Sequence, residues 1–235
     1  MSKKGIVPAS DSRISFTSTS VNVDPNGTIS VTTSGLHYTE NTYKTFLCPN
    51  NAGISICGCA SINNKPIAGF VEKFIRENVD STTVINEIPQ AILNHFRDMG
   101  LTSETTFFVA GYHNENDTLQ QKLYVVKILA NEIKTIDTSQ QGAMWDGDYD
   151  ILSRLIIPMF TKNGNDYHAL PDYQIPWNHF TLQDAIDFAQ SIIKTVINIM
   201  KFQVREKTIG GAIDVLAIKP DTTTWIDKKE LHSSL

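Results

Sequence analysis

The chain has 235 residues, 41% of them hydrophobic, which is enough for one sizeable core and makes one domain more plausible than two. The formal net charge of −5 comes from 20 Lys and Arg against 25 Asp and Glu, and no basic block is longer than Lys228-Lys229. Binding to nucleic acid or to an anionic membrane needs clustered Lys and Arg, so neither is predicted. No apolar run approaches the roughly 20 residues that span a bilayer, and no apolar segment of a signal peptide follows Lys3-Lys4.

The three cysteines are Cys48, Cys57 and Cys59. An odd number in an apolar context argues against a disulfide framework and fits a reducing compartment, so we expect a cytoplasmic protein. A metal site built from these thiols is the alternative. However, alternate residues of one strand share a face, and no His lies at ligand spacing. We therefore predict buried strand cysteines, with no metal and no cofactor.

The first part of the chain, from Gly5 to about Ile62, predicts strands. Residues 14 to 34 are rich in Ser, Thr and Val and are interrupted at Asp24-Pro-Asn-Gly27, a sequence typical of a turn. Thr45-Phe-Leu-Cys48 and Gly53-Ile-Ser-Ile-Cys57 flank a second turn and predict a hairpin.

Two helices are expected next. The first begins near Pro66, where apolar residues recur at steps of three and four positions over 67–75. The second is indicated by a similar spacing from Val84 to Phe96 and ends near Gly100. Pro89 falls early in this second pattern, so it marks an alternative start.

Strands are expected again over 105–111, 122–128 and 132–136, followed by a short helix over 150–157 and a surface loop over 161–174. Thr181 and Asp184 have the spacing of a capping box, and an apolar stripe follows them to Met200, which predicts a long helix. Two final strands are expected over 213–218 and 223–226.

The order of strands, two helices, strands, helices and strands predicts an α+β fold. We expect a four-layer αββα sandwich, in which two stacked and mainly antiparallel sheets are flanked by helix layers. No internal repeat or low-complexity linker divides the chain, so residues 1–235 are expected to form a single domain.

Several residues, taken together, match a known family. The segment Gly5-Ile-Val-Pro-Ala-Ser-Asp-Ser-Arg13 resembles the first hairpin of proteasome β-type subunits and their bacterial relatives, which are N-terminal nucleophile (Ntn) hydrolases. Lys44 falls where the family has its active-site lysine, and Gly58 follows it by 14 residues, as the oxyanion-hole glycine does. Gly210-Gly211 is similar to the closing segment of the family. The resemblance extends over nearly the whole chain and is closest to bacterial proteasome-like proteins outside the true β subunits.

The resemblance implies a threonine-type peptidase or amide hydrolase. In this family an N-terminal Thr attacks a carbonyl through its hydroxyl, and its α-amino group, with a pKa of about 7.7 to 8, acts as the base. By resemblance, Lys44 favours the deprotonated nucleophile and Asp11 pairs with Lys44, while Arg13 supports the same turn. The backbone N–H of Gly58 stabilises the oxyanion. The substrate would be a peptide or another amide, and the partners would be copies of the chain, in a ring or another homo-oligomer.

Taken alone, an Asp-Ser-Arg turn and a distant lysine indicate only a surface salt bridge. The joint spacing of Gly5, Asp11, Arg13, Lys44 and Gly58 is what favours a catalytic site.

The beginning of this sequence departs from the family pattern. Only ten residues precede Asp11, and Ser2, exposed if Met1 is removed, would lie about seven residues, or about 20 Å, short of the nucleophile position. We therefore expect a chain that lacks the family's first strand and its Thr, and is inactive as written. The alternative is a naturally non-catalytic structural or assembly subunit. In either case a missing strand would bare a sheet edge, which predicts lower stability or association through that edge.

Two further departures concern the surroundings of the site. Glu206 replaces an Asp of the family's closing segment, and Ile209 lacks the hydroxyl that the family has there, although Thr208 is adjacent. Asp146 stands where the family has a Ser before a Gly. Cys57 neighbours Gly58, which leaves open a role as a reactive thiol.

Overall fold

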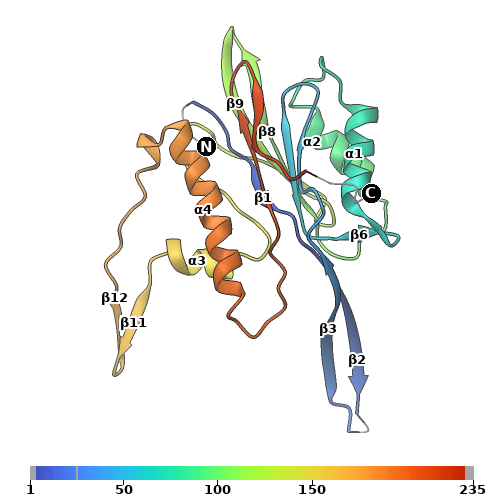
Figure 1. The fold of residues 1–235 in the computed structure, drawn as a ribbon, viewed down its shortest axis with the longest axis vertical. Helices are drawn as coiled ribbons and strands as arrows, with labels where there is room; N and C mark the ends of the chain where they lie inside the picture. Colours follow the sequence, from blue (N-terminus) through green and yellow to red (C-terminus); the bar gives the residue numbers. More distant parts are fainter. Residues whose placement is uncertain (1–3, 25, 231–235) are drawn as a thin grey trace.

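The computed structural model describes residues 4–24 and 26–230 (Figure 1). These residues form a mixed fold of helices and antiparallel sheets. The helices are α1 (Ile67–Asn78), α2 (Ile88–Phe96), α3 (Asp150–Ile156) and α4 (Leu182–Met200), with a 3-10 turn at Trp177–His179.

Two sheets form the centre of the molecule. The larger sheet has five antiparallel strands in the order β10-β9-β8-β5-β4, which are β10 (Glu132–Thr135), β9 (Thr118–Lys127), β8 (Thr106–Glu115), β5 (Gly53–Cys57) and β4 (Thr45–Leu47). The smaller sheet has the order β1-β13-β14, formed by β1 (Ala9–Asp11), β13 (Ile213–Ile218) and β14 (Thr223–Asp227). The hairpin predicted around Pro49 is confirmed, because β4 pairs with β5.

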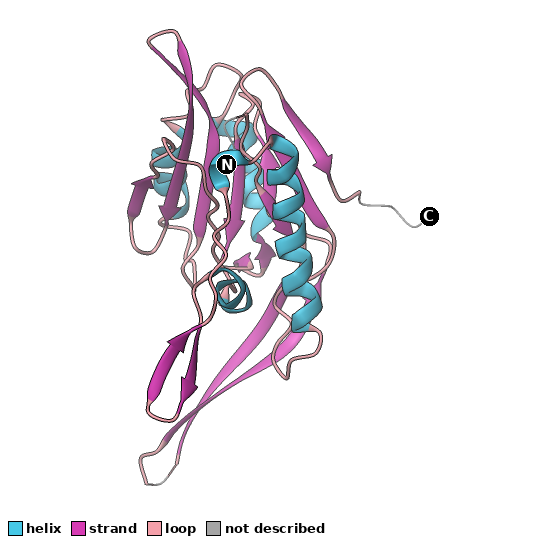
Figure 2. Ribbon diagram, turned by 90° about the vertical axis from the view of Figure 1, so that its left-hand side faces the viewer, coloured by secondary structure: helices cyan, strands magenta, loops and turns pink. Residues whose placement is uncertain are grey.

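Three two-stranded sheets complete the strands of the described chain. They are β2 (Ile14–Val23) with β3 (Ile29–Thr39), β6 (Ser61–Ile62) with β7 (Lys65–Pro66), and β11 (Phe160–Asn163) with β12 (Asp166–Ala169). The β2–β3 hairpin projects far from the body (Figures 1 and 2). Pro25, in the turn predicted there, lies outside the described residues.

The surface loop predicted over 161–174 is wrong in part. Strands β11 and β12 pair antiparallel through a turn at Gly164, whose φ is +63°. Both strands are exposed along their whole length. They therefore lack the alternation of buried and exposed residues that identifies a half-buried strand in a sequence.

The predicted helices are confirmed, with small changes at their starts. Helix α2 begins at Ile88 and places Pro89 in its first turn, so the proline and not Val84 marks the start. In α4, Thr181 accepts the N–H of Asp184, and the Asp184 carboxylate accepts the N–H of Thr181, which completes the predicted capping box. Among the described helices, none has both the length and the apolar character that a membrane span requires.

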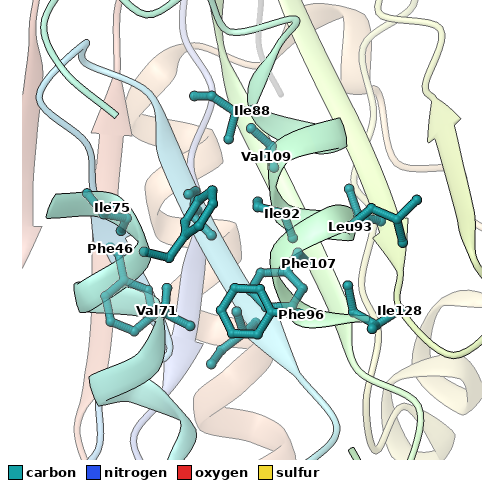
Figure 3. Close-up of a cluster of buried hydrophobic side chains, with 14 of the residues drawn as sticks. Phe46, Val71, Ile75, Ile88, Ile92, Leu93, Phe96, Phe107, Val109 and Ile128 are labelled. Atoms are coloured by element: carbon teal, nitrogen blue, oxygen red, sulfur yellow. The ribbon is translucent and has the colours of Figure 1, made fainter. Parts of the chain in front are cut away.

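The largest core lies between α1, α2 and one face of the five-stranded sheet (Figure 3). Successive residues of a strand point to opposite faces. Phe107 and Val109 of β8 therefore enter this core at 0% exposure. The Phe107 ring centroid lies 4.8 Å from that of Phe96 in α2, and Phe74 of α1 packs 5.9 Å from Phe96.

The other face of the five-stranded sheet packs against the three-stranded sheet. Ala110 of β8 joins Leu216 and Ile218 of β13 in this second cluster. Val215, on the opposite face of β13, packs with Ile186 of α4. The alternation within β13 thus decides which side chains meet a sheet and which meet a helix.

Candidate functional site

The structure brings Asp11 and Lys44 together, as predicted. Asp11 ends β1, and Lys44 directly precedes β4. The Lys44 Nζ atom lies 2.7 Å from Asp11 Oδ1, and their side chains are 18% and 11% exposed. Two strands of different sheets thus place an ion pair largely out of solvent.

The second carboxylate oxygen of Asp11 accepts backbone donors. The N–H of Gly210 lies 3.0 Å from Oδ2, and the N–H of Arg13 lies 3.1 Å from it. A Cβ at Gly210 would lie 2.3 Å from the guanidinium carbon of Arg13, so a larger residue would displace that side chain. This close approach explains the glycine ahead of β13.

Arg13 supports the turn after β1, as predicted. Its guanidinium lies 4.5 Å from the centroid of the Tyr38 ring and donates to the Lys207 carbonyl at 2.9 Å. It also pairs with Glu40. Arg13 thereby ties the end of β1 to the end of β3 and to the segment that precedes Gly210.

Gly58 adopts a backbone conformation that favours glycine, with φ at +107°. A Cβ there would lie 2.1 Å from the carbonyl oxygen of Glu104. Gly58 lines the same pocket as Asp11 and Lys44. The structure therefore places all three predicted site residues around one space.

This pocket has a volume of about 720 Å³ and lies between α4 and the five-stranded sheet. Side chains of α4 form one wall, Phe108 and Ala110 of β8 belong to the opposite wall, and β1 lies along one side. The pocket is mainly apolar, with Asp11 and Lys44 on its lining.

The three residues of undetermined role have different surroundings. Asp146 is exposed, lines the pocket and accepts the N–H of Gly147 at 2.7 Å. Thr208 also lines the pocket and donates its hydroxyl to Asp148. Glu206 is exposed on the segment before Thr208.

Arg205 is a positioning residue that the sequence did not reveal. Its guanidinium donates to Asp148 at 2.6 Å and to Asp150 at 2.8 Å, and this contact lowers the pKa of Asp150. It joins the loop before α3 to the segment before Gly210, and both line the pocket. More than 50 positions separate these residues (55 for Asp150, 57 for Asp148), so no local pattern indicates the pairing.

The cysteines are free, and Cys48 and Cys59 are buried as predicted, whereas Cys57 is half-buried. Burial, together with the negative charge of Asp146, raises the pKa of Cys57 to about 12. A thiol with such a pKa is protonated near neutral pH and is a poor nucleophile. Among the described residues, no group of three or more His, Cys, Asp or Glu side chains is arranged to hold a metal ion.

Comparison with known proteins does not assign the chain to a family. No protein-family model matches it, and a search of the curated proteins finds no match. The site must therefore be interpreted from its own geometry.

Proposed function

We propose that the chain is a proteasome-like Ntn hydrolase in which Lys44, Asp11 and Gly58 serve a threonine-type peptidase or amidase site. The observation that carries this proposal is the 2.7 Å Lys44–Asp11 ion pair on the lining of the pocket that Gly58 also lines. The Lys44 side chain is 18% exposed, and its ammonium can act electrostatically on a group bound in that pocket.

The proposed chemistry is acyl transfer to a threonine that begins a strand in the pocket. The hydroxyl oxygen would attack the substrate carbonyl while its proton passes to the α-amino group of the same threonine. Lys44 would favour the oxyanionic form of that hydroxyl, and the N–H of Gly58 would donate to the tetrahedral oxyanion. The amine leaving group would take up the proton, and water would then release the acyl group.

The order of the packed elements supports the four-layer αββα sandwich of this family. Helices α1 and α2 cover the five-stranded sheet, this sheet packs on the three-stranded sheet, and α4 covers the latter. The space along β1 supports the location of the nucleophile strand, because it lies between α4 and the sheet beside Asp11.

A chain that begins with threonine tests the proposal. A threonine-led apolar strand of about seven residues would be placed ahead of Lys4, with its free amino terminus released by a processing protease. Intact mass spectrometry would then detect acylation by an electrophilic inhibitor selective for N-terminal threonine. We expect one label per chain.

Lys44→Ala should abolish this labelling. Lys122→Ala is a matched control, because Lys122 is also 18% exposed and pairs with Glu115 at 2.6 Å. Labelling that survives Lys44→Ala, or is absent from the folded threonine-led chain, would contradict the hydrolase proposal.

A non-catalytic subunit is the second candidate, and two observations favour it. Cys57, the thiol beside Gly58, has a pKa of about 12, and among the described residues no hydroxyl or thiol is hydrogen-bonded to Lys44. The projecting hairpin exposes Val21, Val23 and Ile29 at 60%, 64% and 66%, which would suit association with further copies.

Sedimentation velocity of the unmodified chain tests this second candidate. An oligomer that dissociates when these three residues are changed to Thr would support an assembly role. A monomer at all concentrations would contradict it.

A further inference from the structure

Two hairpins, β2–β3 and the shorter β11–β12, project from the same end of the molecule (Figures 1 and 2). In Figure 1 they stand apart, with β11–β12 on the left and β2–β3 on the right. A two-stranded hairpin alone has no second layer to cover its apolar side chains and is at best marginally stable in water. An apolar face on either hairpin is therefore open to contact with another molecule.

The β2–β3 hairpin carries apolar side chains on one face near its tip. Val23 lies opposite Ile29 in the strand register, and Val21 is two positions before Val23. Alternate residues of a strand and their cross-strand partners share a face. All three residues are exposed. We call this set the tip patch.

The β11–β12 hairpin carries two aromatic side chains on one face. Phe160 and Lys162 are alternate residues of β11, and Tyr167 lies opposite Lys162. Phe160 is 61% exposed and Tyr167 is 69% exposed. We call Phe160 and Tyr167 the aromatic face, and Lys162 lies on the same side of the hairpin.

The two hairpins carry opposite charges beside these surfaces. Residues 14–39 contain no Lys or Arg, and their single carboxylate is Asp24, which directly follows the tip patch residue Val23. A hydrogen bond from the Thr28 backbone lowers the pKa of Asp24, so this carboxylate is ionised at neutral pH. Neither Asp24 nor Lys162 forms an ion pair with any residue that the structure describes. One copy of the chain therefore presents an anion beside the tip patch and a cation beside the aromatic face.

The area of these surfaces favours a symmetric pair of copies. The five side chains of the tip patch and the aromatic face together expose on the order of 600 Å². One contact between the two surfaces would therefore bury less than the roughly 1,000 Å² that a specific interface needs. A two-fold axis repeats the contact and reaches this size.

The placement of the hairpins allows both contacts to form at once. A two-fold axis perpendicular to the view of Figure 1, at the end from which the hairpins project, brings β11–β12 of one copy beside β2–β3 of the other. The same rotation brings the remaining two hairpins together. Each hairpin then supplies the second layer that the other lacks.

We propose that two copies of the chain form a two-fold dimer in which the aromatic face of each copy packs on the tip patch of the other, with Lys162 near Asp24 of the second copy. The apolar side chains provide most of the affinity, and the opposite charges favour this pairing over contact between like surfaces. The dimer goes beyond the proposed hydrolase, because it requires no nucleophile. It rests on the surface used by the second, non-catalytic candidate and names what that surface binds.

Sedimentation velocity on the unmodified chain tests the proposal, and we expect a dimer that dissociates on dilution. Changing Phe160 and Tyr167 together to Ser should raise the dissociation constant about tenfold or more. His168→Ser is the matched control, because His168 pairs with Thr161 on the opposite face of the same exposed hairpin. A monomer at all concentrations, or equal effects of the two changes, would overturn the proposal.

Mixing two variants tests which surfaces meet. The aromatic-face variant carries the two Ser changes, and the tip-patch variant has Val21, Val23 and Ile29 changed to Thr. Each variant alone retains no intact contact, so both should be monomers. A mixture retains one intact contact and should form a mixed dimer that is weaker than the parent dimer. A tip-patch variant that alone abolishes association, while the aromatic-face variant stays fully dimeric, would support the assembly candidate but overturn this arrangement.

Charge reversal tests the placement of Lys162. Lys162→Glu should weaken the dimer about fivefold at low salt, because it places a carboxylate near Asp24 in both contacts. Lys65→Glu is the control, because Lys65 is also exposed and forms no ion pair with a described residue. Equal effects would overturn the proposed pairing. None of these variants changes Asp11, Lys44 or Gly58, so loss of the dimer and loss of threonine acylation are separate results.

Discussion

Helices α1 and α2 bury an unbroken apolar face, whereas α4 buries only the two ends of its own. On the first side, Val71 and Ile92 are 0% exposed. On the second side, Ile186 and Val196 are buried, but the turns between them lie over the 720 Å³ pocket. Similar apolar stripes therefore form a closed core on one side of the molecule and the wall of a pocket on the other.

The difference follows from the sheets beneath the helices. The five-stranded sheet presents a complete face to α1 and α2. The three-stranded sheet ends at β1, and α4 extends beyond that edge. Tight packing in one region thus gives stability, while the pocket in the other region leaves room for a ligand.

The largest effect is expected from isoleucine truncation on the closed side. Ile92→Ala should lower the free energy of unfolding by about 2–5 kcal/mol, because it opens a cavity in a filled core. Ile192→Ala, beside the existing pocket, should cost only about 1 kcal/mol. Urea unfolding of both variants measures the difference, and equal losses would show that the α4 side is as tightly packed as the α1–α2 side.

A pair of glycine substitutions should give the next largest difference. Gly58→Ala combines a φ of +107° with a contact of 2.1 Å, so we expect a loss of about 2 kcal/mol or more. Gly69→Ala, on the exposed face of α1, has no atom within 4 Å of its new Cβ and should stabilise the chain by about 0.5–1 kcal/mol. Thermal unfolding separates the two outcomes. A tolerated alanine at position 58 would contradict the constrained backbone beside the pocket.

Substitution of a small residue by a larger one tests the same comparison in the opposite direction. Ala68→Leu overpacks the α1 core and should cost about 1–3 kcal/mol. Ala189→Leu enters the pocket and should change the stability by less than about 1 kcal/mol, with a gain as the expected direction. Unfolding in urea measures both, and a comparable loss at position 189 would mean that the pocket is closed to side chains.

The smallest effect concerns Asp214, a buried residue of β13 in the three-stranded sheet. Burial raises the pKa of this carboxyl, whose Oδ1 accepts the Lys229 N–H at 2.6 Å and whose Oδ2 has no partner. The folded state therefore favours the protonated form, so stability falls as the pH rises through the interval between the unfolded pKa, about 3.9, and the raised folded pKa. Asp214→Asn should stabilise the chain by about 1 kcal/mol at pH 7, with no gain below that interval.

Asp137→Asn is the matched control for this pH dependence. A hydrogen bond from the Ser139 backbone lowers the pKa of Asp137, so its ionised form favours folding. Asp137→Asn should therefore be less stable than the parent chain above the unfolded pKa of the Asp137 carboxyl. This change in stability is opposite in sign to that of Asp214→Asn. The free energy of unfolding, measured between pH 3 and 8, distinguishes the two variants. Parallel pH curves for the two variants would contradict the raised pKa of Asp214.

Local patterns predicted the elements well where one face is buried or a cap is present. The stripe and the capping box at Thr181 located α4, and Pro89 located the start of α2. The exposed β11–β12 hairpin gave no such pattern, so it was missed. The resemblance carried by the spacing of Asp11, Lys44 and Gly58 implied that these residues meet, and they line one pocket. Their catalytic roles stay a prediction.

The sequence by itself determined the order of elements, because hydrophobic period and turn chemistry are local properties, and its resemblance to a known family pointed to the residues that gather at the site. Only the tertiary structure decided that the middle of α4 lies over a pocket, that no described strand pairs with the outer edge of β1, and that Arg205 joins two distant loops. These features depend on which surfaces meet, and an apolar stripe is the same in sequence whether it meets a filled core or lines a pocket.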